Sequence, residues 1–176
     1  MVALELYSPR SYGEVVSATI ELRVIDRGDD GLVEDAWTLK EHIRREEGVL
    51  RQRHGFFTDA YTRATTYALV ERGLDDEQLV GFASVRRDGY VLFLAVDAGH
   101  RGEGYGKRLI AEVADDYNTV TCHARTTNQD AVDFYEEIGF EVVRRIDNYY
   151  EDRGDAYYLK LGDDSFAEKL SRFIRR

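Results

Sequence analysis

The sequence predicts an α/β (α+β) fold in which a mixed, mainly antiparallel sheet is flanked by helices. First, strand-like and helix-like segments follow one another in the order β-α-α-β-β-β-α-β-α-β-β-α. Second, glycines and Asp/Asn clusters separate these segments, because Pro9 is the only proline among the 176 residues. Third, residues 90–97 are apolar on both faces, so this strand is expected at the centre of the sheet.

The N-terminal part of the chain predicts one strand and two helices. Residues 1–17 show no clear pattern and are a possible N-terminal extension of a single domain covering the whole chain. ATIELRVID (18–26) alternates as a strand does. Residues 29–48 keep apolar residues at helical spacing and end in a glycine, which predicts a helix. A second, shorter helix with a loop is expected within 49–64.

The middle of the chain predicts three strands, a helix and a fourth strand. Residues 65–71 and 78–87 alternate as strands and are joined by the hairpin segment RGLDDE. The apolar strand at 90–97 follows the turn at RDG. Residues 104–117 place four apolar or aromatic side chains on one helical face, and TVTCHA (119–124) reads as a strand.

The C-terminal part predicts a helix, two strands and a last helix. The helix at 128–139 begins at the N-cap residue Asn128 and ends at a glycine. Residues 141–150 and 156–162 are expected to be strands. The segment 165–176 has the spacing of an amphipathic helix.

Charge argues against a general nucleic-acid-binding protein, which would present a basic face. The formal net charge is −10, from 34 acidic and 24 basic residues, and only four of the basic residues are lysines. An acid-rich, lysine-poor composition is typical of proteins that work in high salt, and an ordinary acidic cytosolic protein is the alternative.

The sequence also predicts no membrane, disulfide or metal chemistry. No apolar run approaches the ~18 to 20 residues of a membrane span, and the N-terminus lacks a signal pattern, so a cytoplasmic location is expected. Cys122 is the only cysteine, which excludes an internal disulfide and a cysteine zinc cluster. The four histidines show no metal-ligand spacing, so no metal is expected.

The segment RGEGYG (101–106) places three glycines between the apolar strand and the following helix. A helix N-terminus presents unpaired N–H groups and partial positive charge, and glycines let a phosphate approach them. The spacing matches neither G-x-x-x-x-G-K-[ST] nor G-x-G-x-x-G. The alternative is a turn that merely connects strand and helix.

The spacing Arg101-x-x-Gly104-x-Gly106 resembles the acetyl-CoA loop of the GNAT superfamily, the Gcn5-related N-acetyltransferases. The resemblance implies that acetyl-CoA is the cosubstrate and that its pyrophosphate rests on backbone amides of this loop. It also implies a splay between the strands at 90–97 and 119–124, with an oxyanion donor on the first of them. The cofactor-binding residues it implies are Leu94, Ala95, Val96, Arg101, Gly102, Glu103, Gly104, Tyr105, Gly106, Lys107 and Asn128.

RTTNQDAVDFYEEIGFEVV (125–143) resembles a second motif of the same family. The shared features are an asparagine at the helix start, an aromatic-tyrosine pair and a Gly-Phe pair. The resemblance implies that Tyr135 protonates the departing thiolate, and a phenol with pKa about 10 holds a proton for this step. From spacing alone, Tyr135 belongs to a stripe with Ala131, Phe134 and Ile138, so a core tyrosine is the alternative.

RRIDNYYEDRGDAYYLKL (144–161) resembles the end of the protein N-terminal acetyltransferases, including the ribosomal-protein alanine acetyltransferases. The resemblance implies that Tyr149 and Tyr150 line the channel for the acceptor. A β-hairpin with cross-strand aromatics is the alternative. Residues 1–60 carry no such resemblance.

His123 occupies the position where these relatives often carry a glutamate as general base. It lies on the face of its strand opposite the apolar residues. A histidine with a pKa near 6.5 can take a proton from an ammonium group. The alternative is a structural histidine. The acceptor amine would then lose its proton through water and backbone carbonyls, or in bulk solvent.

Together these features predict an N-acetyltransferase in which a primary amine attacks the thioester directly, within a ternary complex. A protein or peptide N-terminal amine is the leading acceptor. A small-molecule amine acetyltransferase and a non-catalytic acyl-CoA-binding module are the alternatives. No nucleic-acid or membrane partner is expected, and the oligomeric state is not predicted.

Overall fold

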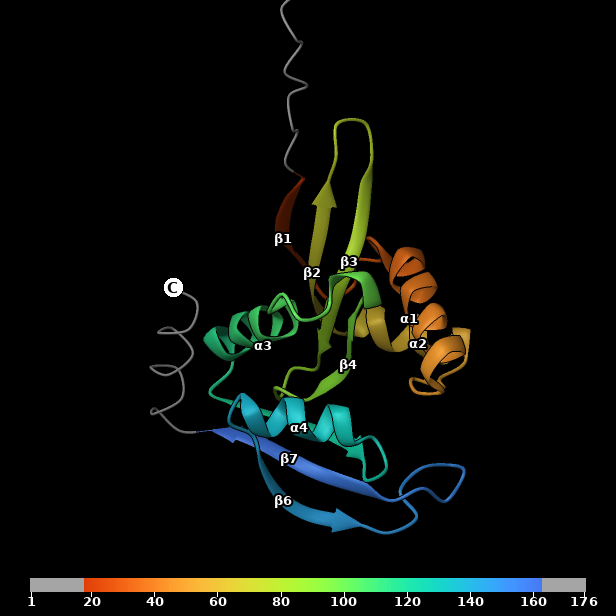
Figure 1. The fold of residues 1–176 in the computed structure, drawn as a ribbon, viewed down its shortest axis with the longest axis vertical. Helices are drawn as coiled ribbons and strands as arrows, with labels where there is room; N and C mark the ends of the chain where they lie inside the picture. The colour runs from red at the N-terminus through yellow and green to blue at the C-terminus, as the bar shows by residue number, and fades with distance from the viewer. Residues whose placement is uncertain (1–17, 163–176) are drawn as a thin grey trace, which may run out of the picture.

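The computed structural model describes residues 18–162, and the elements follow the predicted order (Figure 1). The predictions for 1–17 and for a helix at 165–176 lie outside the described residues. The strands are β1 (Thr19–Ile25), β2 (Thr65–Arg72), β3 (Glu77–Val85), β4 (Val91–Val96), β5 (Thr119–Arg125), β6 (Glu141–Ile146) and β7 (Ala156–Gly162). The helices are α1 (Val33–Glu47), α2 (His54–Arg63), α3 (Tyr105–Asp116) and α4 (Gln129–Glu137), with a 3-10 turn at Ala98–His100.

The strands form two antiparallel sheets, in the orders β1-β2-β3-β4 and β5-β7-β6. The sheets touch at the start of β4, where Tyr90 and Thr121 form a parallel bridge. The Thr121 N–H donates to the Gly89 carbonyl at 3.1 Å. Beyond this bridge β4 and β5 belong to different sheets and diverge, which confirms the predicted splay.

The apolar pattern of β4 predicted a strand at the centre of its sheet. In the structure β4 pairs with β3 and lies at the edge of the four-stranded sheet. It is covered on both faces all the same. Phe93 and Ala95 pack into the core beneath α1 and α2, whereas Leu94 and Val96 pack toward α3. The double-sided apolar pattern therefore reflects burial on two faces and not hydrogen bonding on two edges.

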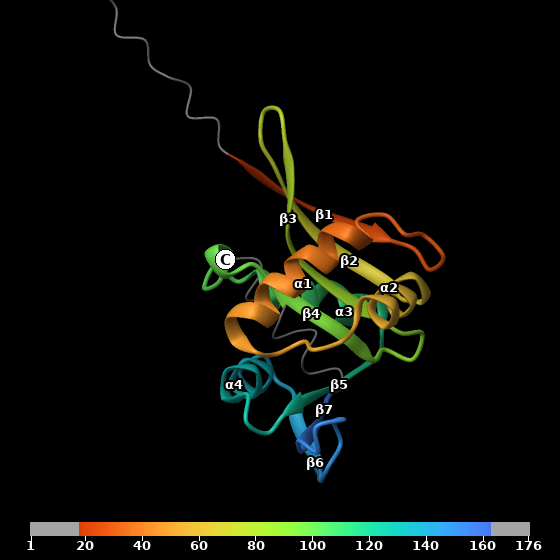
Figure 2. The same cartoon turned by 90° about the vertical axis from the view of Figure 1, so that its right-hand side faces the viewer.

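Helices cover both faces of the four-stranded sheet, with α1 and α2 on one side and α3 on the other (Figure 2). Aromatic rings from α2, β3 and β4 meet in the first core. The ring centroid of Phe57 lies 4.7 Å from that of Phe93 and 6.1 Å from that of Phe82. The second core contains residues of both sheets, such as Leu69 and Leu159. Burial of this shared apolar surface therefore holds the two sheets together across the splay.

The end of strand β6 differs from the prediction. The strand expected over 141–150 ends at Ile146, because Asn148 adopts a positive φ of 53° and turns the chain. The Asp155 carboxylate accepts the Asn148 N–H at 2.9 Å and fixes this turn. Tyr149 and Tyr150 therefore lie in the loop between β6 and β7 and not on a strand.

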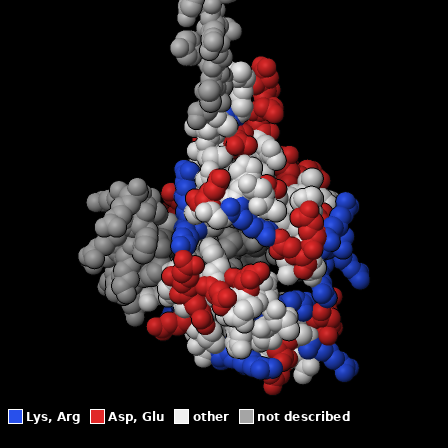
Figure 3. Space-filling view, viewed as in Figure 1, with Lys and Arg blue, Asp and Glu red and all other residues white. Residues whose placement is uncertain are grey.

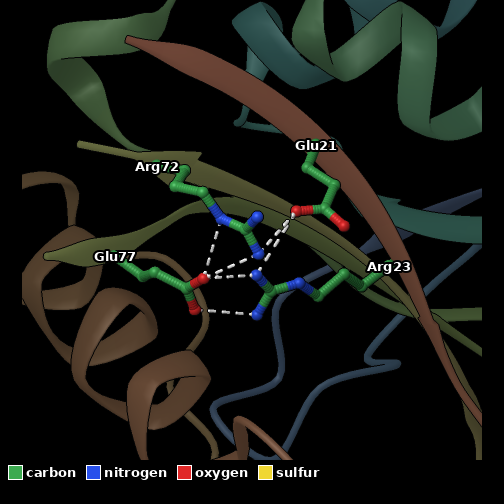
Figure 4. Close-up of polar contacts among 4 residues, drawn as sticks. All are labelled: Glu21, Arg23, Arg72 and Glu77. Atoms are coloured by element: carbon green, nitrogen blue, oxygen red, sulfur yellow. Dashed lines mark hydrogen bonds and ion pairs between the residues drawn. The ribbon is translucent and has the colours of Figure 1, made fainter. Parts of the chain in front are cut away.

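Four charged residues form a network across β1, β2 and β3 (Figure 4). Arg23 donates to Glu77 at 2.7 and 2.9 Å, and Arg72 lies 3.0 Å from Glu77 and 3.2 Å from Glu21. The guanidinium of Arg23, with that of Arg72, lowers the pKa of Glu77 to about 2. Alternating the charges over three strands gives each arginine two carboxylate neighbours, which favours this register.

No helix within residues 18–162 has the length and apolar character needed to cross a membrane. Acidic side chains are prominent on the face that carries α3 and α4 (Figure 3).

Candidate functional site

A cleft of about 1580 Å³ opens where β4 and β5 diverge. Its walls are the loop before α3, the edges of β4 and β5, the start of α4, and the α1–α2 and β6–β7 loops. Small-molecule sites are typically ~300 to 1,000 Å³, so this cleft has room for two ligands side by side. Every site residue predicted from the sequence lines it.

The glycine loop presents free backbone N–H groups to the cleft. Gly102 and Gly104 adopt positive φ angles of 78° and 84°, and a Cβ added to either would meet no atom within 4 Å. Within the described part of the chain, none of the N–H groups of residues 102–107 donates a hydrogen bond. These groups and the N-terminus of α3 can bind an anion such as a pyrophosphate.

Gly106 serves a different purpose from the other two glycines. A Cβ at this position would lie 3.0 Å from Cε2 of Phe134, which is tighter than most real Cβ contacts. The absent side chain lets α3 approach α4, which carries Phe134. Gly106 therefore sets the distance between the two helices that border the cleft.

The two basic residues predicted to bind the cofactor are engaged with protein groups. Arg101 donates from Nε to the Val96 carbonyl at 3.1 Å, and its Nη1 pairs with Glu47. Nζ of Lys107 lies 2.8 Å from Oε1 of Glu137. Arg101 thereby ties the loop to β4 and α1, so an anion at the loop would depend mainly on backbone N–H groups.

His100 lies beside the loop and lines the cleft, and the sequence prediction missed it. Its Nδ1 lies 2.9 Å from Asp97 and its Nε2 lies 3.4 Å from Glu71. The hydrogen bond to Asp97, together with Glu71, raises the pKa of His100. The Asp97 carboxylate also accepts the Gly99 N–H at 3.1 Å. The Asp-x-x-His spacing is the sequence signal that could have predicted the contact between Asp97 and His100.

Gly104→Val is expected to weaken acetyl-CoA binding at least tenfold, about 1.4 kcal/mol. A β-branched residue is strained at a φ of 84°. Its side chain would also occupy the space in which a phosphate approaches the N–H groups. Calorimetric titration with acetyl-CoA measures this loss.

Gly28→Val is the matched control for Gly104→Val. Gly28 has a similar φ of 90° and equally open surroundings, but it does not line the cleft. The control measures the cost of the strained backbone to the fold alone. Unchanged acetyl-CoA affinity in a folded Gly104→Val protein would contradict the assignment of the loop.

The backbone of β4 indicates which of Leu94, Ala95 and Val96 can donate an N–H to an oxyanion in the cleft. The Asp97 N–H donates to the Val80 carbonyl on β3 at 2.8 Å. Because backbone groups alternate along a strand, those of Ala95 are directed to β3, and those of Leu94 and Val96 face the splay. The N–H groups of Leu94 and Val96 are thus available to a carbonyl oxygen in the cleft, and that of Ala95 is not.

Tyr135 lies at the base of the cleft with 8% of its surface exposed. Phe134 and Phe140 hold the ring edge-on, with centroids 5.3 and 5.0 Å away. Burial, with a smaller effect of the neighbouring Cys122, raises its pKa well above 10. Its hydroxyl has the Cys122 thiol as a hydrogen-bonding neighbour, and because sulfur is a weak acceptor the phenol can still donate its proton to a ligand atom.

His123 lies on the cleft face of β5, opposite the buried Cys122 and Ala124, as the alternation predicted. Its ring stacks on Tyr149 with centroids 4.3 Å apart, and its Nδ1 lies 2.8 Å from the hydroxyl of Tyr90. Burial first, then the charges of Arg144 and Arg86, lowers its pKa. The imidazole is therefore neutral at pH 7.

Tyr90 was not predicted as a site residue, although it begins the apolar strand. In the tautomer with its proton on Nδ1, His123 donates to Tyr90, and Nε2 is free to accept a proton. Tyr90 thus fixes the orientation of the ring. Burial raises the pKa of Tyr90, so its hydroxyl stays protonated at neutral pH.

An ion-pair cluster joins the α1–α2 and β6–β7 loops, which both border the cleft. Asp152, in the β6–β7 loop, lies 3.0 Å from Arg125 and 2.9 Å from Arg51 of the α1–α2 loop. The guanidinium of Arg125 also lies 3.9 Å from the centroid of Tyr150. Tyr150 is therefore held beside these charged groups at one end of the cleft.

A buried lysine anchors the α1–α2 loop from below. The side chain of Lys40 is fully buried and donates to the Gln52 carbonyl, with Glu41 3.0 Å from its Nζ. Burial lowers the pKa of Lys40, and Glu41 opposes this shift. Breaking such a buried pair is costly, so Lys40 keeps the loop in place over the cleft.

Asn128 caps α4, as predicted, by accepting the Ala131 N–H at 3.2 Å. Among the described residues no group of three or more His, Cys, Asp or Glu side chains could hold a metal ion.

A family model described as an acetyltransferase (GNAT) domain matches residues 61–154, just over half of the chain. N-alpha-acetyltransferase 30 of Xenopus laevis is 38% identical over 80 residues, which cover 43% of this chain and 29% of that protein. The matched stretches span less than a third of the length of the first curated relatives.

Solved structures show the same fold. Naa50 of Arabidopsis thaliana, in complex with the bisubstrate analogue CoA-Ac-MVNAL, has a TM-score of 0.62 and 26% identity, covering 82% of this chain and 99% of that one. The ribosomal-protein-S18-alanine N-acetyltransferase of Escherichia coli has a TM-score of 0.62 and 21% identity, covering 81% and 93%.

Proposed function

The chain belongs to the GNAT acetyltransferase family, and on that premise we propose that it transfers the acetyl group of acetyl-CoA to the N-terminal amine of a protein or peptide. One observation carries the proposal. The cleft at the splay brings the free N–H groups of residues 102–107 together with Tyr135 and His123. Naa50, solved with a bisubstrate analogue that joins CoA to a peptide, supports the choice of acceptor.

Acetyl-CoA supplies the acetyl group as a thioester. The backbone N–H groups of the loop before α3 hold its pyrophosphate, and the N–H of Leu94 or Val96 polarises the carbonyl. Nε2 of His123 takes the proton of the acceptor ammonium, directly or through one water. The neutral amine attacks the thioester carbon, and as the C–S bond breaks the Tyr135 hydroxyl, protonated because it is buried, gives its proton to the sulfur. The new amide nitrogen loses its second proton to solvent, and Tyr135 is reprotonated from solvent.

The acceptor side of the cleft suits an extended chain. The facing edges of β4 and β5 beyond the Tyr90–Thr121 bridge carry backbone groups that do not pair with one another. The terminal residue of a peptide can bind such groups through its own main chain, and the residues after it can cross the face of the second sheet. Tyr149 and Tyr150 lie beside this opening and can pack against the first side chains of the peptide.

A substrate panel tests the proposal. The purified protein and acetyl-CoA are incubated with unblocked peptides, with the same peptides blocked at the N-terminus, and with small amines, and free thiol is measured. Thiol release is expected with the unblocked peptides only. Release with small amines alone would overturn the peptide assignment, and binding of acetyl-CoA without any turnover would overturn the enzyme assignment.

A further inference from the structure

A row of three side chains crosses the second sheet on its cleft face. His123 on β5 pairs in register with Tyr158 on β7, which pairs with Arg144 on β6. All three line the cleft, and the guanidinium of Arg144 lies 5.5 Å from the centroid of the Tyr158 ring. The proposed base and an arginine therefore belong to one wall, separated by an aromatic ring.

Arg144 differs from most arginines of the cleft in having no carboxylate partner among the described residues. Arg51, Arg86, Arg101 and Arg125 each form an ion pair with an acidic side chain. Even the next residue, Arg145, pairs with acids of the β6–β7 loop. Arg53, at the start of α2, is the other cleft arginine without such a pair within residues 18–162. An unmatched positive charge beside the base is notable in a chain of net charge −10.

We propose that the acceptor carries a carboxylate near its amine, and that Arg144 binds this group as an aspartate or glutamate at the second or third position of the peptide. The inference rests on the proposed function and specifies its substrate class. A guanidinium binds a carboxylate through two parallel N–H···O bonds. The ring of Tyr158 beneath the guanidinium favours a fixed, flat orientation of that fork.

The spacing of the row agrees with these positions. Neighbouring strands lie about 4.8 Å apart, so the Cα atoms of His123 and Arg144 are about 10 Å apart across β7. An extended peptide advances about 3.3 Å per residue. With the amine at His123, the side chain of the second or third residue reaches the guanidinium of Arg144.

A peptide series measures the preference. The peptides are identical except for aspartate, asparagine or lysine at the second or the third position, and kcat/KM is determined for each. We expect aspartate to exceed asparagine about tenfold and lysine to be poorest. The preference should shrink as salt is added, since screening weakens a partly exposed pair.

Two variants assign the preference to Arg144. Arg144→Gln should remove the difference between aspartate and asparagine, and Arg144→Glu should make lysine the best residue. Arg87→Gln is the matched control, because Arg87 is exposed in the β3–β4 turn and does not line the cleft. It removes the same charge and should leave the preference unchanged. Acetyl-CoA affinity confirms that each variant is folded.

The outcomes separate this inference from the proposed function. Equal rates for aspartate, asparagine and lysine peptides would overturn the role of Arg144 and leave peptide acetylation intact. A preference that survives Arg144→Gln but is lost in Arg53→Gln would place the carboxylate at the α1–α2 loop. That result would also overturn the role of Arg144. Failure to acetylate any peptide would instead overturn the proposed function.

Discussion

Tyr135→Phe is expected to lower kcat about 100-fold, if proton transfer to the thiolate limits the rate. The substitution removes only the hydroxyl. The ring remains packed edge-on against Phe134 and Phe140 in the core that joins the two sheets, so the fold should persist. Because burial keeps the pKa of Tyr135 well above 10, the wild-type hydroxyl carries its proton throughout the neutral range. The variant has no proton to give at this position.

Steady-state kinetics and acetyl-CoA titration test this expectation together. kcat and kcat/KM should fall by similar factors, because the lost interaction is made in the transition state. The dissociation constant for acetyl-CoA should stay near the wild-type value. Tyr157→Phe is the matched control, since Tyr157 packs against the same core but does not line the cleft. Wild-type turnover in Tyr135→Phe would return Tyr135 to the role of a core residue.

The parts of the site close to one another in sequence were predictable. A glycine loop between an apolar strand and a helix is a local pattern, as is the stripe that turns Tyr135 inward. The splay followed from the family resemblance and is confirmed by the single bridge at Tyr90 and Thr121. These features depend on backbone conformation and periodicity, which a single sequence records.

The contacts that complete the site join distant residues, and periodicity does not encode them. Arg51 and Asp152 are 101 residues apart, and Tyr90 and His123 are 33 apart. Each pair depends on how the two sheets and their loops pack together. Arg101, predicted to bind the cofactor, likewise pairs with a distant residue, Glu47 of α1, which is 54 residues away. Strand β6 ends early for a local reason, the left-handed Asn148, which β-propensity alone does not reveal.

His123→Ala is expected to remove the acidic limb of the pH profile and to lower kcat/KM about 100-fold on the plateau. Only the neutral imidazole can accept a proton, so activity should rise with pH as His123 loses its own. Burial, Arg144 and Arg86 lower the pKa of His123. The limb should therefore lie below the ordinary value of about 6.5. Acetyl-CoA binding should be unchanged, because His123 lies on β5, away from the loop before α3.

The competing account is deprotonation of the acceptor without a dedicated base. It predicts the same profile in wild type and His123→Ala, with a limb that follows the pKa of the acceptor amine. Two acceptors of different amine pKa, measured with both proteins, decide between the accounts. His123→Glu provides a rescue, since a carboxylate at the same place can accept the proton and should move the limb toward its own lower pKa. Tyr90→Phe should retain a limb but lower the plateau, because the imidazole loses the hydroxyl that orients it. A limb that follows the acceptor and ignores the substitution of His123 would make this histidine structural.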